Sequence, residues 1–343
     1  MPVRARPRKQ RPPAGADRPR THARTHAPAM ESRSVWELAY HREWDALLGR
    51  LATDEGRGEA REEGVGGQLP LHDALCNGAP EEVVRAHLDA YPEGAGRTDN
   101  RGRLPLHVAI CKKAPLEVVR ALLDAYPQGA QTATSAGYLP LHWAASHSAP
   151  LEVVRALLDV HPQGAQTTDN DGSLPLHRAA CTRAPVEVVR ALLDVHPQGA
   201  QTTDIDGQLP LHLAGNKAPL EVVRALLDAH PQGAQTMDRA GRLPLHTAAA
   251  FDNRHPQVLL MLALAHAGHP PSRPWTPETC AILRGIDLDR LPEACRLLVR
   301  ALIDAHVSRV RTLLLALHRL GLPSALAPLL AGAVYKNTAD ILR

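Results

Sequence analysis

Residues 169–195, DNDGSLPLHRAACTRAPVEVVRALLDV, decide the fold because much of the chain repeats them. The string Leu-Pro-Leu-His begins at residues 69, 104, 139, 174, 209 and 243, so its spacing is 35 residues four times and then 34. A fixed period of this length is typical of repeat proteins, in which each unit buries its apolar face only by stacking on a neighbour. The 343-residue chain is therefore predicted to form an array of units.

Each unit has the pattern of a turn followed by two helices. Asp169 and Gly172 are typical of a turn, because Asp can bind its own backbone and Gly accepts a positive φ. Pro175 suits the first turn of a helix, where a missing N–H costs nothing. Pro185 starts a second helix over residues 186–195, with apolar residues at helical spacing on one side. Its charged residues recur from copy to copy and predict a solvated outer face.

This pattern resembles that of the ankyrin-repeat family, D-x-x-G-x-T-P-L-H-x-A-A followed by E-V-V-x-x-L-L, over about residues 67–270. The resemblance implies an all-α, helix-turn-helix solenoid whose turns and first helices line a concave surface that binds other proteins. Three departures alter the expected geometry. The period exceeds the family's 33 residues, Thr134 replaces the turn Asp in one copy, and Leu replaces the Thr that would cap the first helix.

Less regular segments flank the six clear copies. Residues 1–29 are rich in proline and arginine with few apolar residues, which predicts a disordered basic tail. Residues 30–66 are interpreted as a degenerate N-terminal capping repeat and linker. Residues 271–306 are interpreted as a degenerate seventh repeat, and residues 307–343 as C-terminal capping helices.

Charge and composition exclude several classes of function. Residues 31–270 contain 21 Lys/Arg and 29 Asp/Glu, and this acidic balance argues against nucleic-acid binding except through the tail 1–29. The longest uncharged stretch near the C-terminus, residues 320–335, is shorter than a membrane span and contains two prolines. Five cysteines without CxxC spacing favour an intracellular protein of the cytoplasm or nucleus.

The repeated histidine invites a metal hypothesis, which the expected geometry rejects. Neighbouring helices lie about 8–10 Å apart, whereas two nitrogens that share a zinc ion lie within roughly 4 Å of each other. The resemblance implies instead that each histidine binds backbone groups across the turns. These structural residues are His72, His107, His142, His177, His212 and His246.

The positions that differ between copies predict the recognition surface. They follow the turn glycine or end the first helix, where the resemblance places side chains on the concave face. Arg and aromatic residues dominate binding hot spots, so Tyr138 flanked by Arg103 and Arg242 is the predicted centre. Trp143 is left open between surface and core. The other predicted contacts are Lys112, His147, Ser173, Arg183 and Gln208.

No catalytic motif occurs in the sequence, so we expect no enzyme activity, cofactor or metal site. The predicted function is a monomeric, non-catalytic scaffold that binds protein partners. One alternative stays open: an adaptor whose C-terminal helices, over residues 313–330, recruit a second machine such as a ubiquitin ligase.

Overall fold

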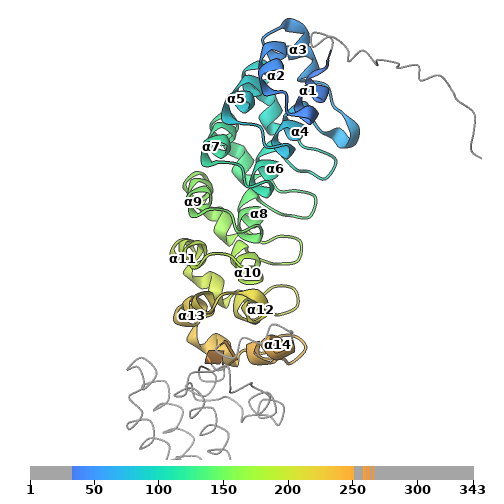
Figure 1. The fold of residues 1–343 in the computed structure, drawn as a ribbon. Coiled ribbons are helices and arrows are strands. Elements are labelled where there is room, and N and C mark those ends of the chain that lie inside the picture. The colour runs from blue at the N-terminus through green and yellow to red at the C-terminus, as the bar shows by residue number, and fades with distance from the viewer. Residues whose placement is uncertain (1–32, 251–257, 260, 263–264, 266–343) are drawn as a thin grey trace, which may run out of the picture. The chain divides into compact units, whose positions relative to one another are not determined.

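A computed structural model describes residues 33–250 together with residues 258, 259, 261, 262 and 265. All regular elements within these residues are helices, which confirms the predicted all-α class (Figure 1). The predicted tail 1–29, seventh repeat 271–306 and capping helices 307–343 lie outside this part of the chain. The alternative adaptor function depends on residues 313–330, which lie outside it too.

Helix pairs repeat along the chain, and the first helix of each pair begins at the predicted proline. The pairs are α4 (Pro70–Cys76) and α5 (Glu81–Ala90), α6 (Pro105–Cys111) and α7 (Leu116–Ala125), α8 (Pro140–Ser146) and α9 (Leu151–Val160), α10 (Pro175–Ala180) and α11 (Val186–Val195), and α12 (Pro210–Lys217) and α13 (Leu220–Ala229), followed by α14 (Pro244–Ala250). A short 3-10 helix follows each second helix: η3 (Pro92–Gly96), η4 (Pro127–Gln131), η5 (Pro162–Gln166), η6 (Pro197–Gln201) and η7 (Pro231–Gln235). Each proline there cannot continue the preceding α-helix.

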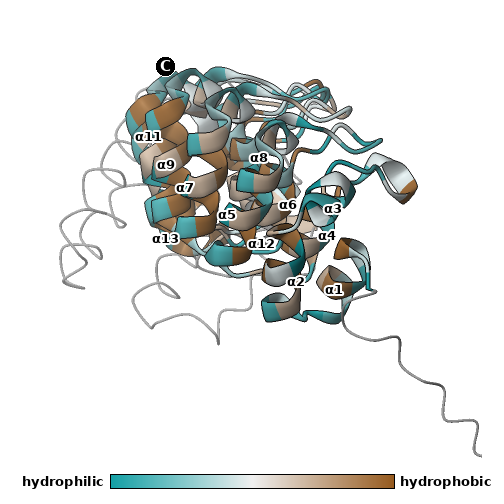
Figure 2. Cartoon of the chain, turned by 90° about the horizontal axis from the view of Figure 1, so that it is seen from above, coloured by the Kyte–Doolittle hydropathy of each residue, from teal (hydrophilic) through white to brown (hydrophobic). Residues whose placement is uncertain are grey.

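First helices pack on first helices, and second helices pack on second helices (Figure 1). The valine pairs of the second helices, such as Val188 and Val189, are fully buried. The leucine before each proline is also buried, including Leu104 and Leu139. Figure 2 shows apolar residues concentrated on the helices and hydrophilic residues along the turn loops. The core is therefore a continuous layer shared by neighbouring units.

The turns are joined to one another by backbone hydrogen bonds. The N–H of Ser135 donates to the carbonyl of Arg101 (3.1 Å), and the N–H of Ile205 donates to the carbonyl of Asp171 (3.1 Å). The glycine of each turn has a positive φ, as at Gly172 (φ 70°). The turns consequently keep a fixed register between repeats, which positions the side chains that follow them.

Helices also precede the first clear copy: α1 (Val35–His41), α2 (Trp44–Leu51), α3 (Asp54–Glu59) and the short 3-10 helix η2 (Val65–Gly67). The side chain of Ser34 caps α1, and that of Thr53 caps α3. Helix α1 packs against α4, and α2 packs against α5. These two helices thus cover the end of the array. The domain boundaries 30–66 and 67–270 stay predictions.

Candidate partner-binding surface

The histidine of each first helix links two repeats through its two ring nitrogens. In His107, Nδ1 accepts the N–H of Leu104 (3.0 Å), and Nε2 lies 3.2 Å from the carbonyl of Tyr138 in the next repeat. Because Nδ1 is the acceptor, the ring is the neutral tautomer with its proton on Nε2, which donates to the carbonyl. His72, His142, His177 and His212 repeat both contacts, while His246 repeats the contact of Nδ1.

Burial of these rings lowers their pKa values. His107 and His142 are fully buried, and burial lowers the pKa of each to about 4 despite the backbone hydrogen bond that favours the charged form. The pKa of His72, His177 and His212 is lowered by burial as well. These five rings therefore stay neutral near pH 7. The hydrogen bond from the leucine N–H to the histidine is the half of a capping box that does not need a Thr hydroxyl.

Two residues predicted to be free for a partner are held by their own turns. The Asp99 carboxylate accepts backbone N–H groups at Oδ1, while Arg103 binds Oδ2 at 2.7 Å. Asp238 and Arg242 repeat this arrangement. Burial by itself would raise the pKa of Asp99, but the hydrogen bonds from Arg103 and the backbone lower it below its usual value. Arg103 and Arg242 therefore stabilise turns, because the residue four positions after the Asp reaches its second oxygen.

Two further predicted contacts also differ from expectation. Ser173 is only 4% exposed, and its backbone N–H donates to the carboxylate of Asp169. The expectation of a free side chain therefore fails at Ser173. Gln208 is half-buried, and its amide lies 3.4 Å from the carboxylate of Asp238 in the next turn.

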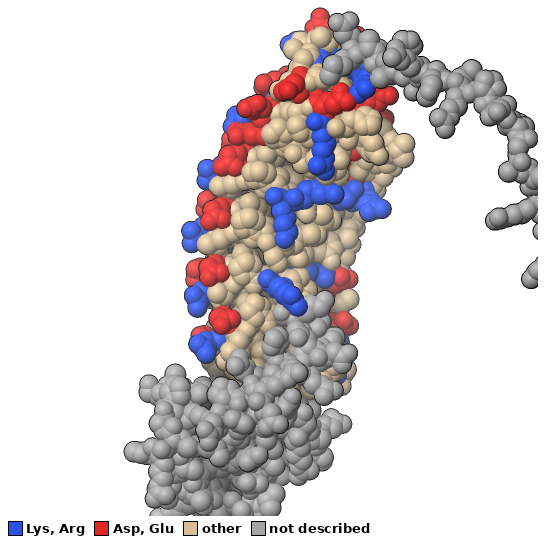
Figure 3. Space-filling model, in the orientation of Figure 1, with Lys and Arg blue, Asp and Glu red and all other residues tan. Residues whose placement is uncertain are grey.

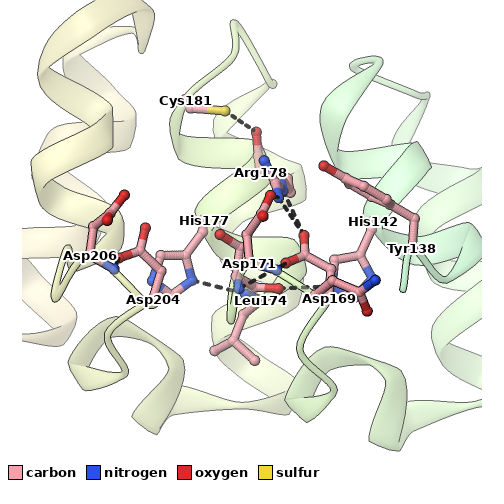
Figure 4. Close-up of polar contacts among 12 residues, drawn as sticks. Tyr138, His142, Asp169, Asp171, Leu174, His177, Arg178, Cys181, Asp204 and Asp206 are labelled. Carbon is pink, nitrogen blue, oxygen red and sulfur yellow. Dashed lines mark hydrogen bonds and ion pairs between the residues drawn. The ribbon is translucent and has the colours of Figure 1, made fainter. Parts of the chain in front are cut away.

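Tyr138 lies at the centre of an aromatic cluster that spans two repeats. The guanidinium of Arg178 lies 4.8 Å from the centroid of the Tyr138 ring (Figure 4). Trp143 packs edge-on against Tyr138 and stacks in parallel on His147, with ring centroids 5.0 Å apart. Trp143 is half-buried against the core, so it belongs to both surface and core. Arg178 escaped the sequence analysis, although it stands nine residues after Asp169.

Arg178 takes the place that Arg103 and Arg242 occupy in other repeats. It binds the fully buried carboxylate of Asp169 at 2.6 Å and that of Asp171 at 2.7 Å (Figure 4). Ser173 is too short to reach the second oxygen of Asp169, so an arginine from α10 binds it instead. The same guanidinium covers Tyr138, which has no arginine of its own turn beside it.

The remaining predicted contacts end the first helices. Lys112 and Lys113 are exposed after α6, and Arg183 is exposed after α10. None of the three forms an ion pair within the part of the chain that the structure describes. His147 ends α8 between them, with Nδ1 bound to the carbonyl of Trp143 and Nε2 3.7 Å from Sγ of Cys111. Because α8 packs between α6 and α10, these side chains share one side of the array.

The second helices carry the opposite surface. Their charged columns, such as Glu152 and Arg155, are exposed, which confirms the predicted solvated face. Shallow grooves between neighbouring second helices are lined by these charges together with Val160 and Val195. This surface repeats almost unchanged from α7 to α13. It therefore offers little that distinguishes one repeat from another.

Side chains for metal binding do not converge in this part of the chain. Among residues 33–250 and the few described beyond them, no three His, Cys, Asp or Glu side chains form a group that could hold a metal ion. Cys76 and Cys111 are free thiols. No helix among the described residues is long and apolar enough to cross a membrane.

Comparisons with known proteins agree with this architecture. A family model for ankyrin repeats in three copies matches residues 71–171, 126–206 and 176–273. The ankyrin repeat domain of Bcl-3, described as a unique member of the IkappaB protein family, is 22% identical with a TM-score of 0.51, over 67% of this chain and 97% of that domain. The human ASB11 ankyrin repeat domain is 22% identical with a TM-score of 0.50, over 67% and 98%. No curated protein sequence matches the chain.

Proposed function

Because the chain belongs to the ankyrin-repeat family, whose members generally mediate protein–protein interaction and are typically non-enzymatic scaffolds, we propose that it binds a protein partner through one defined face. This face, the first-helix surface, consists of exposed or half-buried side chains on the first helices and the segments beside them. Its residues are Lys112, Lys113, Tyr138, Trp143, His147, Arg178 and Arg183.

One observation carries the proposal: differences between repeats concentrate on this face. The outer columns of the second helices keep the same residues, whereas the residue after the column histidine changes from Val108 to Trp143 to Arg178. Identical scaffolding with variable side chains on one face suits recognition, because a few well-placed anchors set most of the affinity of an interface. Tyr138 and Trp143 supply aromatic anchors, and Arg178 fixes the position of Tyr138.

The monomeric state and the intracellular location belong to the same proposal. The free thiols of Cys76 and Cys111 support a reducing compartment. The helices α1 and α2, which cover one end of the stack, support a monomer.

Site-specific photocrosslinking tests the proposed face in the native cell. A photoreactive phenylalanine analogue replaces Tyr138, which lies on the first-helix surface. The matched control places the same analogue at Val160, which is 40% exposed on the second-helix surface. We expect a discrete crosslinked protein from position 138 and none from position 160. Crosslinks from position 160 alone, or from neither position, would contradict the proposal.

A further inference from the structure

The first-helix surface has a charge pattern that the composition of the chain conceals. The four segments 105–116, 140–151, 175–186 and 210–220 contain the first helices α6, α8, α10 and α12 and the loops that follow them. They include lysines and arginines but not one Asp or Glu, although residues 31–270 carry more acidic than basic side chains. These segments of a mainly acidic body thus carry basic residues without acidic ones.

Three of these basic side chains form no ion pair with the described residues. They are Lys112, Lys113 and Arg183, the cationic patch, and all three are exposed. Arg178 differs, because Asp169 and Asp171 neutralise it. Figure 3 shows Lys and Arg side chains gathered across the middle of this view of the array, with carboxylates along its edges.

Carboxylates lie at two edges of the first-helix surface. Asp73 lies on α4, one repeat before Lys112, and both side chains act on the same thiol, Cys76. Asp171 and Asp206 are exposed at the turns. A negatively charged ligand is therefore attracted to the strip between these edges and repelled beyond them.

An aromatic surface divides the cationic patch. Trp143 and its stacked neighbour His147 lie on α8, which packs between α6 and α10. A ligand that contacts the lysines after α6 and the arginine after α10 must pass over this pair. Neighbouring helices pack about 8–10 Å apart, so this path is roughly 20 Å long. An extended peptide of about six residues spans that length at ~3.3 Å per residue.

We propose that the first-helix surface binds an extended acidic segment of another protein, with carboxylates at the cationic patch and an apolar side chain against Trp143. This proposal rests on the proposed function and specifies the class of its partner. The observations favour a protein over a nucleic acid, because the bounding carboxylates leave a narrow strip with three unpaired cations. Tight nucleic-acid binding takes more phosphate contacts than that, about 6–10.

A labelled acidic peptide tests the proposal on the full chain. The probe is a fluorescent peptide of about twelve residues, rich in Glu with one central Leu, and its control has Gln in place of every Glu. Fluorescence anisotropy at low salt measures affinity. Carbodiimide crosslinking then joins carboxylates of the probe to nearby lysines, and peptide mapping identifies those lysines. We expect binding of the Glu probe with crosslinks at Lys112 and Lys113, and weak binding of the Gln control.

Matched variants separate the patch from general electrostatic attraction. The triple variant Lys112→Ala, Lys113→Ala, Arg183→Ala removes the cationic patch, and Arg120→Ala, Arg155→Ala, Arg190→Ala removes three exposed arginines of the second-helix surface. We expect the first variant to weaken binding about tenfold, since exposed charges contribute modestly one by one. The second is expected to change binding by less than about twofold. Equal effects of the two variants would overturn the proposal.

Crosslink mapping and competition provide further outcomes that would overturn the proposed acidic partner. Crosslinks at Lys9 without Lys112 or Lys113 would assign the probe to the basic tail. Displacement of the probe from Lys112 and Lys113 by an equally charged oligonucleotide that binds more tightly would assign the patch to nucleic acid.

Failure of this inference can be told apart from failure of the proposed function. If the acidic probe does not bind while position 138 still crosslinks a cellular protein, the acidic class of partner is wrong and the proposed function stands. If both fail, the proposed function is wrong too.

Discussion

Arg178 covers the ring of Tyr138 from the following repeat, with its guanidinium 4.8 Å from the ring centroid. The same guanidinium binds Asp169, whose carboxylate is fully buried. One side chain thus fixes an aromatic residue of the proposed binding face and neutralises a buried charge of the turn. Packing of the first-helix surface and stability of the array are therefore coupled at this position.

We expect Arg178→Ala to lower the free energy of unfolding by about 2 kcal/mol, because Asp169 keeps its two backbone donors but loses the arginine at its second oxygen. Urea unfolding at neutral pH measures the change. Arg190→Ala is the control, since Arg190 is exposed and its loss should cost less than about 0.5 kcal/mol. Similar losses in the two variants would show that Arg178 has no special structural role.

A buried histidine in α5 has no counterpart in the other second helices. His87 is 2% exposed, and neither ring nitrogen has a hydrogen-bond partner among the described residues. The equivalent positions hold Leu122, Leu157 and Leu192. Burial lowers the pKa of His87 to about 4.

Replacing His87 with Leu should therefore stabilise the protein by about 1–3 kcal/mol at pH 7, because it removes unsatisfied buried polar atoms and restores the apolar residue of the other copies. The reciprocal change, Leu122→His, should destabilise it by a similar or larger amount. Thermal and urea unfolding of both variants provide the measurement. A destabilised His87→Leu protein would mean that the histidine makes a contact essential to the fold.

The fold was largely predictable from the sequence because the repeat supplies many copies of one pattern. Turn aspartates, helix-starting prolines and buried valines each follow from local chemistry that any single copy displays. Interactions between copies were harder to predict. Arg103 and Arg178 both bind the aspartate of their turn, but from different sequence positions. Arg103 stands four residues after its aspartate, whereas Ser173 at that position is too short, and Arg178 binds Asp169 instead. Sequence spacing alone does not give that distance.

The substitution of Leu for the capping Thr shows a second limit. The loss of the side-chain cap at the helix start was predictable from the sequence, but the burial of the leucine side chain was not. Leu104 is fully buried in the core that neighbouring units share, while His107 accepts the N–H of Leu104. A residue that is poor for the local helix is thus retained by packing across units, and only coordinates reveal that contact.

Acid should destabilise the array at pH values well above those at which most proteins unfold. His107 and His142 have pKa values of about 4 in the folded protein and about 6.5 when unfolded. Between these limits the unfolded chain binds more protons, so the free energy of unfolding falls as the pH is lowered from about 6.5 to about 4. Above pH 6.5 both states are neutral and this contribution to pH dependence disappears.

Urea unfolding at several pH values between 7.5 and 4.5 measures this slope. Each fully titrated ring should contribute on the order of 3 kcal/mol, so loss of structure is expected before pH 4. His107→Gln provides a comparison, since glutamine does not titrate: the variant is less stable at pH 7.5 but should show a smaller slope. A constant free energy of unfolding between pH 6.5 and 4.5 would contradict the assigned neutral tautomer.

Gly215 sets the closest approach between two first helices. A Cβ at this position would lie 2.5 Å from Cβ and 2.8 Å from Cα of Ala248, so α12 and α14 would have to move apart. Gly215→Ala should therefore destabilise the protein by about 1–3 kcal/mol, as expected for overpacking, even though Ala favours helix more than Gly does.

Gly49 in α2 is the matched control, because a Cβ there meets nothing within 4 Å. Gly49→Ala should stabilise the protein by up to about 1 kcal/mol through helix propensity alone. Opposite signs in urea unfolding are the expected result, and stabilisation by both substitutions would show that α12 and α14 are not in close contact.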